Sequence, residues 1–415
     1  MDERTGTVTA TGVAVKHVAR INTSTLPEST NPEFRFRYID ISAVNSAGVV
    51  MIPEEVVAFR QAPSRARRLA GPGSVLVSTI RTYLRAIARA PVKSPVPYVY
   101  STGFAILEPI SDSIDARYLA YACMSDGFVD SVVARSTGVS YPAINPGELG
   151  AIRIPVPGLA EQRRIADFLD DQVARIDNVI AARTRQAALC DAELTARLRM
   201  LLLQGPAIPA RRFFREAVVG IVVQPAQYYV SADEPGVPTL RGLNVSERTI
   251  STDSLVRISA RGHQLHPRSQ LHTGDIVVVR TGDAGATSLV PAWADDWNAI
   301  DLVIVRANAK ADPQYLVHAL NANRRSQSIA AASSGSIQQH FGVSAIGDLP
   351  IVWRDLVEQA KVSKSADEAY SRRDEGTTRQ KESMQLLQEL RRSLITAAVN
   401  GGFDVSAADG SSVPA

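Results

Sequence analysis

The sequence is poor in the residues that build disulfide frameworks and metal clusters. Among 415 residues there are two cysteines, Cys123 and Cys190, which stand far apart and without a CxxC partner. A disulfide framework and a zinc ribbon are therefore excluded, and a reducing cytoplasm is the expected compartment. No apolar run approaches the roughly 18–20 residues that cross a bilayer. Charged residues open the chain with no apolar segment behind them, so we expect neither a membrane span nor a signal peptide.

The motifs of nucleotide hydrolysis and methyl transfer are also missing. No glycine is followed by Lys and Ser/Thr as in a phosphate-binding loop, and no GxGxxG follows a strand pattern. Asn31-Pro32-Glu33-Phe34 lacks the second proline of the Asn-Pro-Pro-Phe/Tyr loop of amino-group methyltransferases. His263 and His266 are a possible metal-ligand pair without a third ligand, so surface or phosphate contacts are favoured. The sequence therefore predicts no catalytic site, no cofactor and no metal.

Lysine is scarce as well, because only six of the 45 cationic residues are lysines and the rest are arginines. The net charge of +3 is only mildly basic. The arginines reflect either the codon usage of a GC-rich genome or a need for guanidinium forks that bind phosphates and guanine edges. The contents of 45% hydrophobic and 21% charged residues are ordinary for a folded chain of two or three domains. The distribution of the arginines has to decide between the two explanations.

An internal duplication organises the chain. When the sequence is shifted by 197 positions, matching residues recur in one order from Asp115 to Gly205 without insertion or deletion. The matched pairs are Asp115 and Asp312, Tyr118 and Tyr315, Leu119 and Leu316, Ser131 and Ser328, Gly138 and Gly335, Ile154 and Ile351, Leu159 and Leu356, Glu161 and Glu358, Gln162 and Gln359, Asp170 and Asp367, Arg175 and Arg372, Asp177 and Asp374, and Gly205 and Gly402. Further upstream the offset changes slightly, so the copies differ there in their loops.

Each copy is predicted to be a mixed, β-rich globular part followed by a long helix. In the first copy we expect strands at residues 34–41, 74–80 and 98–107 and a short helix at residues 116–125. In the second copy we expect strands at residues 275–280 and 302–305 and a helix at residues 313–323. The segment from Gly282 to Gly285 connects two strands and is expected to be a turn.

The two long helices are indicated by apolar residues at alternating spacings of three and four. The first seam comprises Ile165, Leu169, Val173, Ile176, Ile180, Ala187, Cys190, Leu194, Leu198 and Leu201, and it ends at Gly205-Pro206. The second is weakened by polar residues around Gly376, and it resumes at Met384, Leu387, Leu390, Leu394 and Ala398. A helix of about 43 residues is on the order of 65 Å long and needs a partner for its seam.

The equal lengths of the two helices make each the expected partner of the other. We predict an α+β fold with two globular domains separated by two long helices that form an antiparallel coiled coil. The expected boundaries are residues 1–157 for the first domain, 158–205 for the central helix, 206–354 for the second domain, 355–402 for the distal helix and 403–415 for a disordered tail. A coiled coil between chains is the alternative use of the seam.

The arginines gather where acids are absent. No acidic residue occurs between Val56 and Leu107, and the DNA-contact candidates in this window are Arg65, Arg67, Arg68, Arg81, Tyr83, Arg85 and Arg89. The second copy has a thinner equivalent, with the candidates Arg261, His263, Arg280, Thr281, Asp283, Gln338, Gln339 and His340. Amide side chains such as Gln338 pair with adenine. The alternative to a DNA surface is a solvated basic face.

Three segments carry a resemblance to a known family. They are Ile154-Pro-Val-Pro-Gly-Leu-Ala-Glu161-Gln162 with Ala174-Arg-Ile-Asp177 after it, the terminal stretch from Leu390 to Val405, and Gly274-Asp-Ile-Val-Val-Val-Arg280. Together they resemble the specificity subunit of type I restriction–modification systems over nearly the whole chain. The second junction, from Ile351 to Gln359, departs from the pattern because it lacks both prolines.

This resemblance implies a non-catalytic subunit that recognises a bipartite, asymmetric sequence in double-stranded DNA. It implies two methyltransferase subunits held mainly on the helices and two ATP-driven restriction subunits. S-adenosylmethionine and ATP would then bind to those partners, and this chain would need no cofactor. The alternative function is a duplicated coiled-coil scaffold that joins two protein partners without sequence-specific DNA binding.

Overall fold

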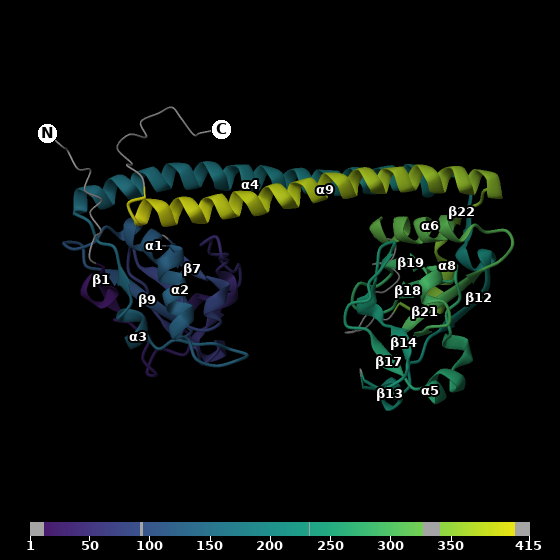
Figure 1. Ribbon diagram of the computed structural model, residues 1–415, viewed down its shortest axis with the longest axis horizontal. Helices are drawn as coiled ribbons and strands as arrows, with labels where there is room; N and C mark the ends of the chain where they lie inside the picture. Colours follow the sequence, from purple (N-terminus) through teal and green to yellow (C-terminus); the bar gives the residue numbers. More distant parts are fainter. Residues whose placement is uncertain (1–11, 92–93, 232, 327–340, 403–415) are drawn as a thin grey trace. The chain divides into compact units, whose positions relative to one another are not determined.

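A computed structural model describes residues 12–91, 94–231, 233–326 and 341–402. The chain divides into two compact units, residues 1–183 with 381–415 and residues 184–380. Each unit holds one globular domain and one segment of each of two long helices, α4 (Leu159–Leu202) and α9 (Leu356–Val399) (Figure 1). The tail predicted at residues 403–415 lies outside the described residues.

The described part of the first unit's globular domain is built from two four-stranded sheets, the two-stranded sheet β1-β10 and three helices. Its elements are β1 (Val13–Ala14), β2 (Ala19–Ile21), β3 (Arg35–Ile39), β4 (Val57–Ala58), β5 (Ala66–Arg68), β6 (Val75–Ser78), β7 (Ile87–Arg89), β8 (Tyr98–Ser101), β9 (Phe104–Pro109), α1 (Ala116–Met124), α2 (Asp126–Arg135), α3 (Pro146–Gly150) and β10 (Arg153–Ile154). One sheet has the order β2-β9-β6-β7 and is antiparallel, and the other has the order β4-β3-β8-β5 with β3 parallel to β8.

The second unit repeats this topology. Its elements are β11 (Ala207–Pro209), β12 (Phe214–Val219), β13 (Tyr229–Val230), β14 (Val237–Leu240), β15 (Val245–Ser246), β16 (Thr249–Ile250), β17 (Val256–Ile258), α5 (Ala260–Leu265), β18 (Ile276–Val279), β19 (Thr287–Leu289), β20 (Asn298–Ala299), β21 (Leu302–Ala307), α6 (Pro313–Arg325), α8 (Val343–Asp348) and β22 (Pro350–Val352). The sheet β12-β21-β18-β19 corresponds to β2-β9-β6-β7, and β14 is parallel to β20 as β3 is to β8. The α+β fold and its duplication are therefore confirmed.

An inner strand of each antiparallel four-stranded sheet is buried on both faces. In β6, Val75 and Val77 pack against α1, whereas Leu76 faces the sheet that contains β3 and β8. Side chains alternate between the faces of a strand, so a continuous apolar run fits a strand covered on both sides. Residues of β18 divide between two cores in the same way. One strand prediction was wrong, because residues 98–107 form β8 and β9, with Thr102 and Gly103 between them.

The residues that match across the duplication fasten each globular domain to a long helix. Gln162 on α4 is buried, and its Oε1 accepts a hydrogen bond from the backbone N–H of Asp115 at 2.8 Å. Its Nε2 donates to the carbonyl oxygens of Ser113 at 3.3 Å and Pro157 at 2.7 Å. Gln359 on α9 makes the same three bonds, with partners shifted by 197 positions, namely Asp312, Lys310 and Arg354. The residues that are identical in the two copies therefore make identical contacts between a globular domain and a long helix, and we call each set of contacts a joint.

A carboxylate about two helical turns after each glutamine makes a second set of contacts between the domain and the long helix. Asp170 accepts hydrogen bonds from Tyr121 Oη at 2.7 Å, Arg89 Nη2 at 3.1 Å and Arg117 Nη1 at 3.2 Å. In the second unit the matching carboxylate is Asp367, and its partners are Arg248 Nη2 at 2.9 Å and His318 Nε2 at 3.1 Å. The second joint therefore places a buried histidine where the first has a tyrosine.

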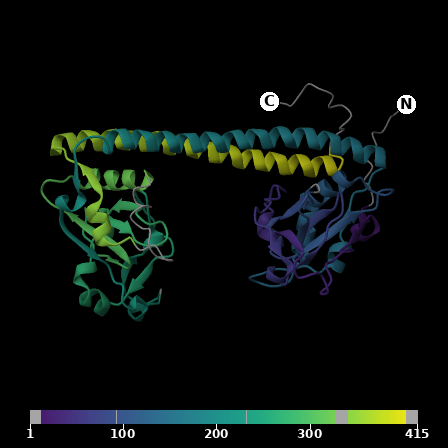
Figure 2. The same ribbon diagram turned by 180° about the vertical axis from the view of Figure 1, so that it is seen from behind.

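The seam of α4 is buried unevenly. Ile165, Leu169 and Val173 are buried in the first unit together with Ile395 and Ala398 of α9, while Leu194, Leu198 and Leu202 are buried in the second unit with Ala366, Ala369 and Tyr370. The long helices run antiparallel within each unit (Figure 2). The central positions Ile180, Ala187 and Cys190 are only half-buried.

Two positions of the predicted seams were wrong. Leu202 takes the fully buried place expected for Leu201, because this end of α4 packs into the core of a globular domain as well as against α9. Leu390 is 52% exposed, and its neighbour Arg391 points inward instead. The Arg391 guanidinium reaches Asp177 Oδ1 at 3.1 Å and the carbonyl oxygen of Ala47 at 2.8 Å, so a paired cation occupies the apolar position.

The glycine predicted to weaken the second helix does not interrupt it. α9 is continuous through Gly376, and a Cβ built on that glycine would lie 3.4 Å from Sγ of Cys190. The small residue therefore lies where α4 and α9 approach closely within the second unit. Among the described helices, none has an apolar stretch long enough to cross a membrane.

Candidate nucleic-acid interface

The loop between β6 and β7 carries two exposed candidates of the first unit, Arg81 and Tyr83. It contains a short 3-10 turn, Thr82–Leu84, with Tyr83 53% exposed. The residues on either side, Arg81 and Arg85, have left-handed backbones with φ of 52° and 56°. This conformation costs a residue with a Cβ on the order of 1–2 kcal/mol. It persists only where the surroundings hold it, which is common at functional sites.

A second loop, residues 136–143, holds this one in place. The backbone N–H of Arg81 donates to the carbonyl oxygen of Pro142 at 2.8 Å. The hydroxyls of Thr82 and Ser136 are hydrogen-bonded at 2.8 Å. The two loops therefore form one surface, although some 55 residues separate them in the sequence.

The two loops border a cavity of about 540 Å³ in which charged and apolar groups meet. The guanidinium carbon of Arg81 lies 4.7 Å from the ring centroid of Tyr141, whose side chain is 61% exposed. Arg65 faces the same cavity and lies 3.7 Å from a carboxylate oxygen of Asp40. The remaining lining residues are Ile41, Ser42, Val44, Asn45, Ser46, Ile80, Leu84 and Ala86.

Other arginines of the acid-free window serve the fold. Arg85 is bound to Asp126 on α2, and Arg89 is bound to Asp170 on α4. Both acids lie outside the window, so the lack of neighbouring acids in the sequence did not leave these arginines unpaired. We therefore remove Arg85 and Arg89 from the set of DNA contacts.

Arg67 and Arg68 are intermediate cases. The Arg67 guanidinium carbon lies 4.7 Å from the ring centroid of Phe59. Arg68 is half-buried on β5, and burial lowers the pKa of its guanidinium. The structure thus brings Arg65, Arg81 and Tyr83 to one region, gives Arg67, Arg85 and Arg89 contacts within the fold, and leaves Arg68 half-buried.

In the second unit, the loop between β18 and β19 is tied down by carboxylates. Arg280 Nη1 lies 2.6 Å from Asp301 Oδ1, and Thr281 Oγ1 lies 3.2 Å from Asp301 Oδ2. Asp283 is paired with Arg324 at the end of α6. The turn expected at residues 282–285 is confirmed by positive φ angles of 87° at Gly282 and 83° at Gly285.

Two further candidates of the second unit, Arg261 and His263, lie on the short helix α5. Arg261 is exposed on α5, but His263 is engaged internally, with Nδ1 2.5 Å from the amide oxygen of Asn298. His263 is therefore withdrawn as a DNA contact. Gln338, Gln339 and His340 lie outside the described residues. Within the described part of the chain, no group of three His, Cys, Asp or Glu side chains could hold a metal.

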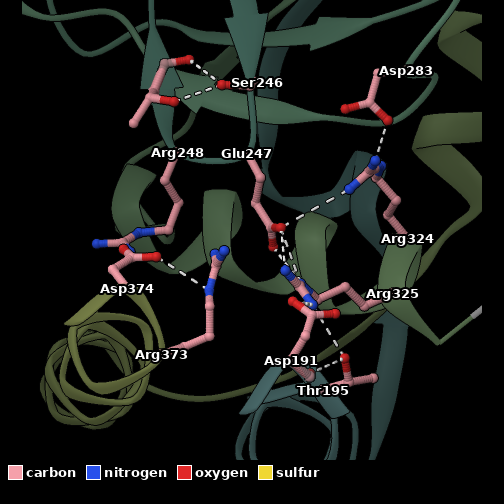
Figure 3. A pocket seen from close by; sticks show the side chains of 11 residues that line it. Asp191, Thr195, Ser246, Glu247, Arg248, Asp283, Arg324, Arg325, Arg373 and Asp374 are labelled. Atoms are coloured by element: carbon pink, nitrogen blue, oxygen red, sulfur yellow. Dashed lines mark hydrogen bonds and ion pairs between the residues drawn. The ribbon is translucent and has the colours of Figure 1, made fainter. Parts of the chain in front are cut away.

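A polar pocket of about 970 Å³ lies where the second domain meets the helices (Figure 3). Arg325 binds Glu247 with Nη2 at 2.6 Å and Asp191 of α4 with Nη1 at 3.0 Å. Burial alone would lower the pKa of Arg325, but Glu247 and Asp191 outweigh it and hold the pKa above its usual value. Because the acids that line the pocket neutralise its arginines, we assign it a structural role.

Sequence reasoning missed Tyr141, although the duplication contained a signal for it. The offset of 197 positions pairs Tyr141 with Gln338, which was selected in the second copy. Applying the same offset to the DNA-contact candidates of the second copy would have identified residues 136–143 of the first copy as a candidate loop. The pairs Arg85–Asp126 and Arg89–Asp170 gave no such signal, because neither acid is near its arginine in the sequence.

Comparisons with known proteins agree on one family. A model of the type I restriction modification DNA specificity domain matches residues 66–184. The type I restriction enzyme EcoBI specificity subunit of Escherichia coli is 24% identical over 236 residues, which cover 51% of this chain and 48% of that protein. The StySPI specificity subunit of Salmonella potsdam is 34% identical over 98 residues, 21% of each chain. The chain spans about half the length or less of these curated relatives.

A solved structure extends the likeness of fold to nearly the whole chain. A chain from a structure concerned with complex assembly and conformational transition of the type I R-M system matches with a TM-score of 0.68 and 21% identity. The match covers 94% of this chain and 97% of that one. At this level of identity the likeness concerns the fold alone.

Proposed function

We propose that this chain, which belongs to the family of type I restriction–modification specificity subunits, recognises a bipartite, asymmetric DNA sequence. The duplication is the observation that carries the proposal. Two domains of one topology are fastened to the long helices by the same contacts of Gln162 and Gln359. Their loops differ, with Arg81 beside Tyr141 in one and Arg280 bound to Asp301 in the other. Similar scaffolds with different loops suit two half-sites of different sequence.

We further propose that catalysis belongs to partner subunits. Methyltransferase subunits that use S-adenosylmethionine would bind on the long helices, and ATP-driven restriction subunits would complete the assembly. Exposed apolar side chains on the helices support a protein-binding role, among them Leu189, Met200 and Leu386. The two cysteines are unpaired, which supports a reducing cytoplasmic location.

The alternative is a duplicated scaffold that joins two protein partners without reading DNA. The loop that presents Arg81 and Tyr83 favours DNA recognition, because arginine forks bind phosphates and base edges and both of these side chains are exposed. Selection from a pool of random DNA duplexes separates the two functions. The chain, bound to its methyltransferase subunits, should enrich duplexes that share two defined blocks separated by a spacer of constant length.

The outcome of that selection is informative in both directions. If the assembled complex enriches no common sequence, DNA recognition is excluded and the scaffold function stands. DNA binding should also weaken steeply with salt, because arginine contacts to phosphates release counterions.

The chain purified alone should show no methyl transfer. Turnover by the isolated polypeptide would contradict the assignment of catalysis to the partners.

A further inference from the structure

We infer that Arg81, held against the ring of Tyr141, reads a guanine base in the half-site of the first domain. This inference rests on the proposed function and adds to it a named base-reading residue and the positioning residue beside it.

Arg81 differs from four other arginines of the window in having no acidic partner. It differs from Arg67 and Arg68, for which the described residues also supply no carboxylate partner, in being exposed where they are half-buried. Arg60, Arg65, Arg85 and Arg89 each lie within 4.0 Å of a carboxylate. Within the residues that the structure describes, no carboxylate lies within that distance of Arg81, and its side chain donates none of the recorded hydrogen bonds. Its guanidinium is exposed and keeps its donors available. An arginine fork presents two parallel N–H groups, and the O6 and N7 atoms of guanine accept such a pair in the major groove.

Tyr141 holds this fork in position without using its donors. A guanidinium over a ring is attracted to the ring face, and the contact at 4.7 Å leaves the N–H groups free to bind in the plane. The backbone beneath is fixed at both loops, through the bond from Arg81 N–H to Pro142 and through Thr82 and Ser136. A side chain that is already ordered loses less entropy when it binds.

The surroundings of Arg81 suit a base edge better than a phosphate. Tyr83 and Leu84 are exposed on the same turn, at 53% and 45%. Leu84 and the ring of Tyr83 can pack on base edges and on the methyl group of thymine, whereas a phosphate gains nothing from Leu84. Arg65 stands across the cavity with Asp40 as a partner, so it is not equivalent to Arg81.

The test measures base preference and salt dependence for single variants of the chain in complex with its methyltransferase subunits. Arg81→Lys keeps the charge and removes the fork, and Arg81→Gly keeps the left-handed backbone, which glycine adopts readily. Tyr141→Ala removes the ring, and Tyr141→Phe keeps it. Arg60→Ala is the matched control, because it removes an exposed arginine of the same window that is paired with Glu33. Unfolding midpoints confirm that each variant is folded.

We expect both Arg81 variants to lose about 10- to 100-fold of the discrimination for one G·C pair in one half-site. Tyr141→Ala should lose part of that discrimination, while Tyr141→Phe and Arg60→Ala keep it. The slope of affinity against salt should be unchanged by Arg81→Lys. If the Arg81 variants keep the wild-type preference, or weaken binding equally for all sequences, Arg81 reads no base and the inference fails. If the wild-type complex itself selects no sequence, the proposed function fails instead.

Discussion

At the scale of single residues, buried polar contacts decide how each domain is attached. Gln162 and Gln359 each satisfy one backbone N–H and two carbonyl oxygens where a domain meets a long helix. Both amides are almost completely buried. A smaller side chain would leave those backbone groups without partners and without room for full hydration, which is more costly than the loss of an exposed hydrogen bond.

We expect Gln162→Ala and Gln359→Ala each to lower the free energy of unfolding by about 2 kcal/mol. Urea unfolding followed by circular dichroism measures the effect. Gln388→Ala is the matched control, since Gln388 is exposed on α9 and should change stability little. Equal stabilities for the Gln162 and Gln388 variants would contradict the role assigned to the buried amide.

His318 gives the second joint a dependence on pH. It is fully buried against Tyr370, and burial lowers its pKa to about 4 despite the opposing carboxylate of Asp367. Arg248 also lowers this pKa, and Asp312 opposes the shift weakly. A histidine in the unfolded chain has a pKa of about 6.5. The unfolded state therefore binds the proton first, and the stabilisation present above about pH 6.5 is lost as the pH falls toward 4.

Lowering the pH from 7 to 5 should reduce the free energy of unfolding by about 2 kcal/mol through the protonation of His318 in the unfolded chain. His318→Gln keeps a side-chain N–H group and does not titrate, so its stability should fall less over the same range. Urea unfolding at the two pH values gives the comparison. A wild-type chain and a His318→Gln variant with the same pH dependence would show that His318 is protonated already in the folded state or is not buried.

The arginines show how far residue-level prediction reaches. Their clustering in an acid-free window selected the loop of Arg81, where the side chain has no acidic partner among the described residues, and a DNA contact there stays a prediction. It did not reveal the ion pairs of Arg85 and Arg89, because Asp126 and Asp170 approach them only in the folded chain. Charge pattern along a sequence records local composition, whereas pairing depends on tertiary distance.

At the scale of elements, the long helices were the most predictable part. The spacing of three and four from Ile165 to Leu198 specifies a single apolar stripe, and α4 and α9 are each continuous for 44 residues. The departures at Leu202 and Arg391 arise where a helix packs on more than its partner helix. Periodicity identifies one buried face, and it does not reveal a second one supplied by a globular domain.

If the helices set the distance between the half-sites, their length should set the spacer. One helical turn is about 5.4 Å long, and one base pair occupies about 3.4 Å of DNA. Inserting four residues near Thr184 should therefore lengthen the spacer by one or two base pairs and leave both recognised blocks unchanged. Mapping of methylated sites in cells that carry the variant measures this. An unchanged spacer in an assembled, active complex would show that something other than helix length fixes the distance.

At the scale of the whole molecule, the chain is one structural plan used twice. Matching residues at an offset of 197 predicted the duplication, because the contacts of the joints admit few substitutes. The loops between β6 and β7 and between β18 and β19 could not be predicted in the same way, since they carry different residues and different partners. The two copies share the contacts that attach a globular domain to a long helix. They differ in the loops that are proposed to read DNA.

Replacement of one domain tests this division most directly. Residues 211–349 would be exchanged for the equivalent segment of a relative with a different target, and methylated adenines would be mapped by sequencing in cells that supply the methyltransferase subunits. The joint residues Gln359 and Asp367 lie outside the exchanged segment, and their partners Lys310, Asp312, Arg248 and His318 lie inside it, so the donor segment has to supply equivalent groups. We expect one half-site to change to that of the donor while the other half-site and the spacer stay the same. A change in both half-sites, or in neither, would contradict recognition by two independent domains.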